Sequence, residues 1–243
     1  MQLGISGKTA LVTGANRGTG ECIAAGLRAE GVKVITHANS GAAADVIADI
    51  TCAHGSADAL DQLAGRDIDI LVNNYGTTNR HNWRDSDTEK WLEMYQSNVL
   101  SAARLAQGLM SGMSARGWGR IINLGTTGSH QPNHIMPAYY AAKGALATLG
   151  VSLAKELSNT GVTVNTVAPG LIHTEEVEAA YRARAQKHGR EDWEAMVVET
   201  DFPNPCGRIA RREEVADLVI FLCSERAAFI NGQNIRIDGG AVH

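Results

Sequence analysis

Short runs rich in β-branched residues alternate along this chain with longer stretches of helical pattern. Two of the runs, at 69–72 and 120–124, are nearly unbroken apolar, which is typical of parallel strands buried on both faces of a sheet. The alternation predicts strands at 8–13, 32–36, 69–72, 120–124, 162–167 and 234–237, with helices at 18–30, 86–115, 137–159 and 211–223. Parallel strands joined through helices make right-handed crossovers, so helices cover both faces of the sheet. We therefore predict an α/β fold with a doubly wound sheet of the Rossmann type.

Two segments depart from this alternation. Residues 38–58 must hold a strand, with or without a short helix, and a strand near 45–50 would make the parallel sheet seven-stranded. Residues 173–206 are highly charged and poor in strand formers, which predicts a helical insertion that acts as a lid over the substrate. Because the chain has 243 residues and no evident linker or repeat, residues 1–243 are expected to form one domain.

Composition argues against several kinds of partner. Apolar residues make up 44% of the chain and charged residues 20%, as in an average soluble protein, and the net charge is −4. Without a basic run, we expect neither nucleic acid nor a membrane as a partner. The N-terminus lacks the pattern of a signal peptide. The four cysteines are scattered with no C-x-x-C pair, so we expect no metal site and a cytoplasmic location.

A glycine-rich turn follows the first predicted strand and opens the first predicted helix. Its spacing is G-x-x-x-G-x-G, and it contains Gly14, Asn16, Arg17, Gly18, Thr19 and Gly20. Glycines allow a tight turn in which backbone N–H groups approach a pyrophosphate at the positive end of a helix. The strand–turn–helix setting favours a dinucleotide site. The alternative is a glycine-rich turn that binds no ligand.

The stretch after this helix bears on the choice of cofactor. Proteins that bind NAD place an acidic residue about 20 residues beyond the glycines, where it binds the ribose 2′-hydroxyl. Residues 31–44 contain no Asp or Glu, and Ala38 and Asn39 stand near the end of the second strand. Arg17, within the turn, can pair with a 2′-phosphate unless it is only a solvated loop residue. The sequence thus predicts NADP(H) in preference to NAD(H).

A tyrosine and a lysine are placed one helical turn apart, as Tyr139 and Lys143. A free phenol has a pKa near 10, and a neighbouring ammonium together with an oxidised nicotinamide lowers it. The pair could therefore exchange a proton with a substrate, although two residues on a solvated helix face would show the same spacing. Paired asparagines at Asn73 and Asn74 end the third predicted strand, where their amides can hold irregular backbone.

Taken in order, these motifs resemble the short-chain dehydrogenase/reductase family, and within it the reductases of the 3-oxoacyl type. The resemblance covers residues 6–240 and includes Asn-Thr-Val-Ala-Pro-Gly at 165–170 and Asp-Gly-Gly at 238–240. It implies that Tyr139 donates a proton to a carbonyl oxygen, that Lys143 holds the nicotinamide ribose, and that Asn98 positions a water. It further implies cofactor contacts at Gly14, Asn16, Arg17, Gly18, Thr19, Gly20, Asn39, Asp49, Ile50, Asn74, Gly76, Tyr139, Lys143, Pro169, Gly170, Ile172 and Thr174.

Two positions depart from the family pattern. The family serine that polarises the carbonyl stands thirteen residues before the tyrosine, where this chain has Thr126, which keeps the hydroxyl. Tyr75 replaces the alanine of Asn-Asn-Ala-Gly, either shaping the substrate pocket or filling space. Residues expected near the substrate are Tyr75, Thr127, His130, Met136, Tyr140 and Trp193.

The function implied by the resemblance is hydride transfer between NADP(H) and a carbonyl or secondary alcohol through Asn98, Thr126, Tyr139 and Lys143. The expected partner is a small-molecule substrate whose identity the sequence does not name. Two alternatives stay open: an NADP(H)-binding regulator without turnover, and a lyase or epimerase of the same family. The family also implies a homotetramer. A stripe of small residues at Ala141, Ala145, Thr148 and Ser152 would allow close contact between helices.

Overall fold

The computed structural model describes residues 2–41, 43–78 and 80–241. Its centre is a parallel sheet with strand order β3-β2-β1-β4-β5-β6-β7, which confirms the predicted seven-stranded, doubly wound Rossmann architecture. The strands are β1 (Thr9–Thr13), β2 (Lys33–Ala38), β3 (Val46–Ile47), β4 (Ile70–Asn73), β5 (Gly119–Leu124), β6 (Val162–Pro169) and β7 (Asn234–Ile237). Strand order reverses between β1 and β4. In open α/β sheets a ligand binds at this reversal, beyond the carboxyl ends of the strands.

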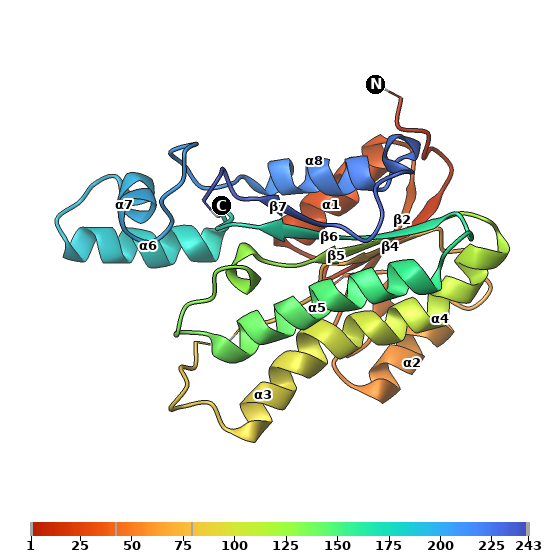
Figure 1. The fold of residues 1–243 in the computed structure, drawn as a ribbon, viewed down its shortest axis with the longest axis horizontal. Coiled ribbons are helices and arrows are strands. Elements are labelled where there is room, and N and C mark those ends of the chain that lie inside the picture. Colours follow the sequence, from red (N-terminus) through yellow and green to blue (C-terminus); the bar gives the residue numbers. More distant parts are fainter. Residues whose placement is uncertain (1, 42, 79, 242–243) are drawn as a thin grey trace.

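Helices cover both faces of the sheet (Figure 1). One layer holds α1 (Gly18–Ala29) and α8 (Arg212–Leu222), which pack against each other. The other layer holds α2 (Ala53–Gln62), α4 (Ser101–Ala115) and α5 (Pro137–Glu156). Alternate residues of each strand point to opposite faces, so the sheet supplies two separate apolar cores.

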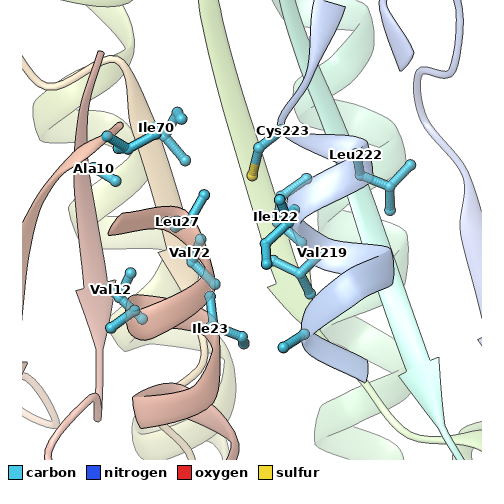
Figure 2. Close-up of a cluster of buried hydrophobic side chains, with 14 of the residues drawn as sticks. Ala10, Val12, Ile23, Leu27, Ile70, Val72, Ile122, Val219, Leu222 and Cys223 are labelled. Atoms are coloured by element: carbon cyan, nitrogen blue, oxygen red, sulfur yellow. The ribbon is translucent and has the colours of Figure 1, made fainter. Parts of the chain in front are cut away.

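The core under α1 and α8 shows how this alternation works (Figure 2). Val12, Val72 and Ile122 come from three neighbouring strands and meet side chains of α1 and α8. Their strand neighbours Leu11 and Leu71 belong to the core on the opposite face. Each of these strand side chains is at most 1% exposed. Such burial on both faces fixes the register of the strands and therefore the position of their carboxyl ends.

The helix predicted at 86–115 is a continuous helical run with a change of pitch inside it. It comprises α3 (Thr88–Tyr95), a π-helical turn (Gln96–Leu100) and α4. A π-helical turn inserts an extra residue into a helix and is frequent at functional sites. Here the turn contains Asn98, which is buried.

The segment 38–58 holds both a strand and the start of a helix. The strand is the short β3, within the predicted 45–50, and α2 begins at Ala53. Just before β3, the Asp45 carboxylate accepts the backbone N–H of Thr36 in β2 at 2.8 Å. The sequence left a helix here open, because AHGSADALDQ offers few large apolar residues; the structure shows α2 in addition to the expected strand.

The segment 173–206 contains α6 (Glu175–Lys187) and α7 (Trp193–Thr200) and lies beyond the carboxyl edge of the sheet (Figure 1). Trp193, Met196, Val197 and Ala185 are buried together and form a small core between the two helices. Within the described part of the chain, no helix combines the length and apolarity needed to cross a bilayer.

Candidate active site

The glycine-rich turn is shaped to receive a phosphate group. Gly14 and Gly18 both have a φ of 62°, which favours glycine. A Cβ on Gly20 would stand 2.3 Å from the carbonyl oxygen of Gly14, so only glycine fits there. The helix α1 begins at Gly18, and its N-cap Arg17 makes no side-chain capping bond to the first N–H groups. Those N–H groups fit the pyrophosphate of a dinucleotide.

The end of β4 holds this turn in place. Asn74 donates its side-chain amide to the carbonyl oxygens of Thr13 and Gly14, at 2.9 and 3.1 Å. The backbone N–H of Tyr75 donates to the Thr13 hydroxyl at 2.9 Å. Asn74 therefore secures irregular backbone at the strand end, as predicted, whereas Asn73 donates its amide to the side chain of Asn123 at 2.9 Å.

The predicted tyrosine and lysine both lie on α5 and point into one cleft. Lys143 is buried, and its Nζ donates to the carbonyl oxygen of Leu124 at 2.7 Å. The same Nζ lies 5.9 Å from the centre of the Tyr139 ring. The last residue of β5 thus fixes the ammonium near the phenol.

Asn98 enters the cleft from the π-helical turn. Its side-chain amide donates to the carbonyl oxygens of Thr77 and Met94, at 2.9 and 3.0 Å. Its Oδ1 is buried and has no hydrogen-bond partner among the described residues. A Cβ on Gly76 would stand 2.6 Å from this oxygen and 3.0 Å from Lys143 Nζ, so both atoms border the same small space. A buried acceptor of this kind is suited to hold a water.

Thr126 reaches Tyr139 from the segment after β5. A hydrogen bond between the two side chains lowers the pKa of Tyr139, and the Thr126 hydroxyl also accepts the backbone N–H of Gly128 at 3.2 Å. The nearby Ser129 instead donates its hydroxyl to the carbonyl oxygen of Thr126 at 2.7 Å. Thr126 is therefore the hydroxyl that meets the tyrosine.

Burial sets the protonation states of Tyr139 and Lys143. It raises the pKa of Tyr139 to about 12, with a further rise from Tyr140, against the smaller effect of the Thr126 hydrogen bond. Burial lowers the pKa of Lys143 to about 8. At neutral pH the phenol is thus protonated, as a proton donor must be, and the ammonium is mostly charged.

A cavity of about 180 Å³ collects most of the predicted catalytic and nicotinamide-side residues. It is lined by Thr19, Asn74, Gly76, Thr77, Thr78, Asn98, Leu124, Gly125, Tyr139, Lys143, Pro169 and Ile172. Of these, Thr77, Thr78, Leu124 and Gly125 escaped sequence analysis. Thr77 has a buried hydroxyl without a hydrogen-bond partner in the described structure, and its position just after the strand-end asparagines could have identified it.

A larger cavity of about 550 Å³ lies beside the first, between the loop after β5, the end of α7 and the residues after β7. Thr127 and Tyr140 line it, as does Gly170. Met136 lies near the first cavity, where its sulfur contacts the hydroxyl of Thr78, one of the lining residues.

Three residues predicted for the substrate pocket lie elsewhere and line neither cavity. His130 is exposed and pairs with the Asn234 amide at 2.9 Å. Trp193 is buried in the core between α6 and α7, because it is the first residue of α7 and faces α6. Tyr75 turns towards Asn39, 3.0 Å from its hydroxyl, because its backbone is tied to the end of β1.

The remaining predicted cofactor residues surround the carboxyl ends of β1 to β3 and β6. Asp49 accepts a hydrogen bond from Asn39, and Ile50 is buried beside α2. Thr174 caps α6 by accepting the N–H of Val177 at 3.2 Å. Arg17 is exposed, and its guanidinium lies 3.7 Å from the carboxylate of Glu176 on α6.

A phosphate-binding turn and a buried tyrosine–lysine pair at the reversal of a parallel sheet define a class, the dinucleotide-dependent oxidoreductases. Comparison with known proteins is more specific. A family model described as enoyl-(acyl carrier protein) reductase matches residues 14–242. The chain belongs to the short-chain dehydrogenase/reductase family of oxidoreductases.

Curated relatives and solved structures agree with this assignment. The chain is 34% identical to the 3-oxoacyl-acyl-carrier-protein reductase FabG of Escherichia coli strain K12, over 98% of each chain. The structure of L-sorbose reductase from Gluconobacter frateurii, complexed with NADPH and L-sorbose, is 32% identical, with a TM-score of 0.92 over 100% of this chain and 99% of that one. A 3-oxoacyl-acyl-carrier-protein reductase from Agrobacterium tumefaciens C58, with NADP bound, is 30% identical, with a TM-score of 0.88 over 98% and 96%.

Proposed function

We propose that this protein reduces a small carbonyl compound with NADPH, or oxidises the matching alcohol, through Tyr139, Lys143, Asn98 and Thr126. One observation carries the proposal. The buried phenol, the buried ammonium and the unpartnered amide oxygen of Asn98 converge beside the phosphate-binding turn.

Each residue has a distinct part in the chemistry. When bound, the nicotinamide supplies or accepts the hydride. Tyr139 donates its proton to the carbonyl oxygen, and the hydroxyl of Thr126 stabilises the negative charge that develops there. The charge of Lys143 favours the phenolate that Tyr139 becomes after donation. A water held by Asn98 Oδ1 would return a proton to that phenolate.

The choice of NADP(H) over NAD(H) rests on charge at the adenosine end. Arg17 is 80% exposed, and it could exchange its exposed ion pair with Glu176 for a 2′-phosphate. The sequence has no acidic residue within 31–44. An anionic group also suits the N-terminus of α1. The neighbouring structures complexed with NADPH or NADP support this choice.

A substrate panel tests the proposed activity. NADPH absorbance would be followed with β-ketoesters, cyclic ketones, quinones and ketoses, L-sorbose included because one structural neighbour carries it. We expect NADPH oxidation with at least one compound, and Tyr139→Phe is the control that should lose it. A protein that binds NADPH tightly but turns over no compound in any class would favour the regulatory alternative. Conversion of a substrate without net NADPH consumption would favour the lyase or epimerase.

We also propose that the segment 173–206 closes over the substrate and that the protein is a homotetramer. The segment stands at the mouth of the larger cavity through Asp201 and Phe202. Exposed apolar side chains at Leu92, Leu100 and Val151 lie on α3, the π-helical turn and α5, where a second copy could cover them. Light scattering checks the assembly, and an active monomer at low concentration would exclude it.

A further inference from the structure

Tyr75 lies beside the glycine-rich turn and Asn39, at the region that we call the adenosine end of the cleft because the family resemblance implies that the adenosine half of the cofactor binds there. Its Cα lies 3.2 Å from where a Cβ on Gly14 would be, so the residue touches the glycine-rich turn. Its hydroxyl lies 3.0 Å from Nδ2 of Asn39, just beyond the end of β2. Within the described structure it does not line the cavity that contains Tyr139 and Lys143.

The hydrogen bonds around Tyr75 leave two groups unused. Asn39 Nδ2 donates both to the Tyr75 hydroxyl and to Asp49 Oδ1, the latter at 2.7 Å. Burial, followed by the charges of Asp49 and Glu93, raises the pKa of Tyr75, so the phenol keeps its proton. Because the phenolic oxygen accepts from Asn39, that proton is available to another acceptor. Asn39 Oδ1 is buried and has no donor among the residues described.

His37 fixes the place of the Tyr75 ring. The two rings meet edge to face, with centroids 6.4 Å apart and planes at 86°. The carbonyl of Ala48 can only accept and lies 2.9 Å from Nε2, so Nε2 carries the proton. Nδ1 then accepts from the N–H of Gly14 at 3.4 Å. Burial lowers the pKa of His37, which keeps the ring neutral. Tyr75 is therefore positioned by residues of β2 and the glycine-rich turn.

We propose that Tyr75 and Asn39 together bind the adenosine ribose of the cofactor, an inference that rests on the proposed NADP(H) function. The Tyr75 hydroxyl donates to a ribose oxygen or to the 2′-phosphate, and Asn39 Oδ1 accepts from a ribose hydroxyl. This pair takes the place of the acidic residue that NAD-binding proteins use there. Tyr75 then contributes to cofactor recognition, and removal of its hydroxyl should weaken binding of the adenosine half of the cofactor.

The test uses 2′,5′-ADP, which contains the adenosine half and no nicotinamide. Isothermal titration calorimetry would compare wild type, Tyr75→Phe and Tyr140→Phe. Tyr140 is a matched control because its hydroxyl also accepts from an asparagine, Asn133 at 3.2 Å, while its side chain lines the larger cavity, which Tyr75 does not line. We expect Tyr75→Phe to weaken 2′,5′-ADP binding about tenfold, which corresponds to about 1.4 kcal/mol. Tyr140→Phe should bind as wild type does.

The outcomes separate this inference from the function beneath it. Equal affinity of wild type and Tyr75→Phe for 2′,5′-ADP overturns the ribose contact, as does an equal loss in Tyr140→Phe. A wild-type protein that binds neither 2′,5′-ADP nor NADPH overturns the proposed function itself. Thermal melts of each variant ensure that only folded protein is compared. Tyr75→Phe keeps the aromatic ring against His37 and removes only the hydroxyl. If Tyr75 served only to pack against His37, the variant would bind 2′,5′-ADP as tightly as wild type does.

Discussion

At the catalytic end of the cleft, polar side chains are anchored to main-chain carbonyls, whereas at the adenosine end they are anchored mainly to one another. Lys143 donates to Leu124, and Asn98 donates to Thr77 and Met94. By contrast, Asn39 bonds the side chains of Asp49 and Tyr75. Main-chain carbonyls keep their place whatever side chains surround them. The positions of Lys143 and Asn98 therefore depend on the backbone of neighbouring elements, whereas the position of Asn39 depends on the identity of two other side chains.

The catalytic end should respond most strongly to loss of the tyrosine hydroxyl. Tyr139→Phe removes the phenolic proton donor beside Thr126 and Lys143, so we expect the rate of NADPH oxidation to fall by about 10³-fold. Tyr140→Phe should retain much of the activity, because one residue rotates a side chain by about 100° around a helix. Initial rates at saturating NADPH measure both, and similar losses in the two variants would contradict the assignment.

The hydroxyl that polarises the carbonyl should come next in size. Thr126→Val keeps the shape of the side chain and removes its hydroxyl, so kcat should fall by roughly 10²-fold. Thr126→Ser should remain active. Ser129→Ala should change little, because its hydroxyl is already used in the bond to the Thr126 carbonyl. If Ser129→Ala were the damaging change, the register between β5 and α5 inferred from spacing would be wrong.

The buried ammonium of Lys143 should change how the free energy of unfolding depends on pH. Because folding lowers the pKa of Lys143 from 10.5 to about 8, the unfolded chain binds more protons between these pH values, and stability gains as pH rises through that window. Relative to Lys143→Met, wild type should gain up to about 1.4 kcal/mol per pH unit above pH 8. Urea denaturation from pH 7 to 10 measures this difference. Parallel curves for the two proteins would show that Lys143 titrates normally.

The adenosine end should give the smallest of these effects. We expect NADPH to bind at least tenfold more tightly than NADH, about 1.4 kcal/mol, because Arg17 can pair with the 2′-phosphate. Arg17→Ala should reduce that preference without changing the NADH dissociation constant. Fluorescence titration of both cofactors provides the values. Equal dissociation constants in wild type would remove the distinction that we draw between the two ends.

Spacing along the chain predicted what lies on regular elements. Tyr139 and Lys143 share a helix face, and the glycine-rich turn follows β1, so their meeting at the sheet edge follows from topology. The predicted helix at 86–115 is present, but the spacing of its apolar residues does not reveal the π-helical turn at Gln96–Leu100. That turn determines where Asn98 points.

Contacts between side chains from different strands could not be predicted in this way. From sequence, Tyr75 could equally shape the substrate pocket or fill space, and its place beside Asn39 follows from its tether to Thr13 and its bond with Asn39. Trp193 was placed near the substrate because it is a large apolar residue in a charged segment. It instead packs between α6 and α7 against Ala185 and Met196, and sequence spacing does not specify these contacts.

The segment with α6 and α7 begins and ends at a neck where Ile172 pairs with Ala210 as an isolated bridge, and it also contacts the rest of the protein through the Cys206 N–H, which donates to the Gly239 carbonyl at 3.3 Å. The backbone of this neck closes with bonds from His173 N–H to Ala210 and from Ala210 N–H to Leu171, at 2.8 and 3.1 Å. Since much of its apolar surface is buried within itself, the segment can be exchanged as a cassette between the two sides of that bridge. If the segment acts as the proposed lid, a graft from a relative is expected to transfer substrate preference while leaving the sheet, α5 with Tyr139 and Lys143, and the π-helical turn with Asn98 unchanged.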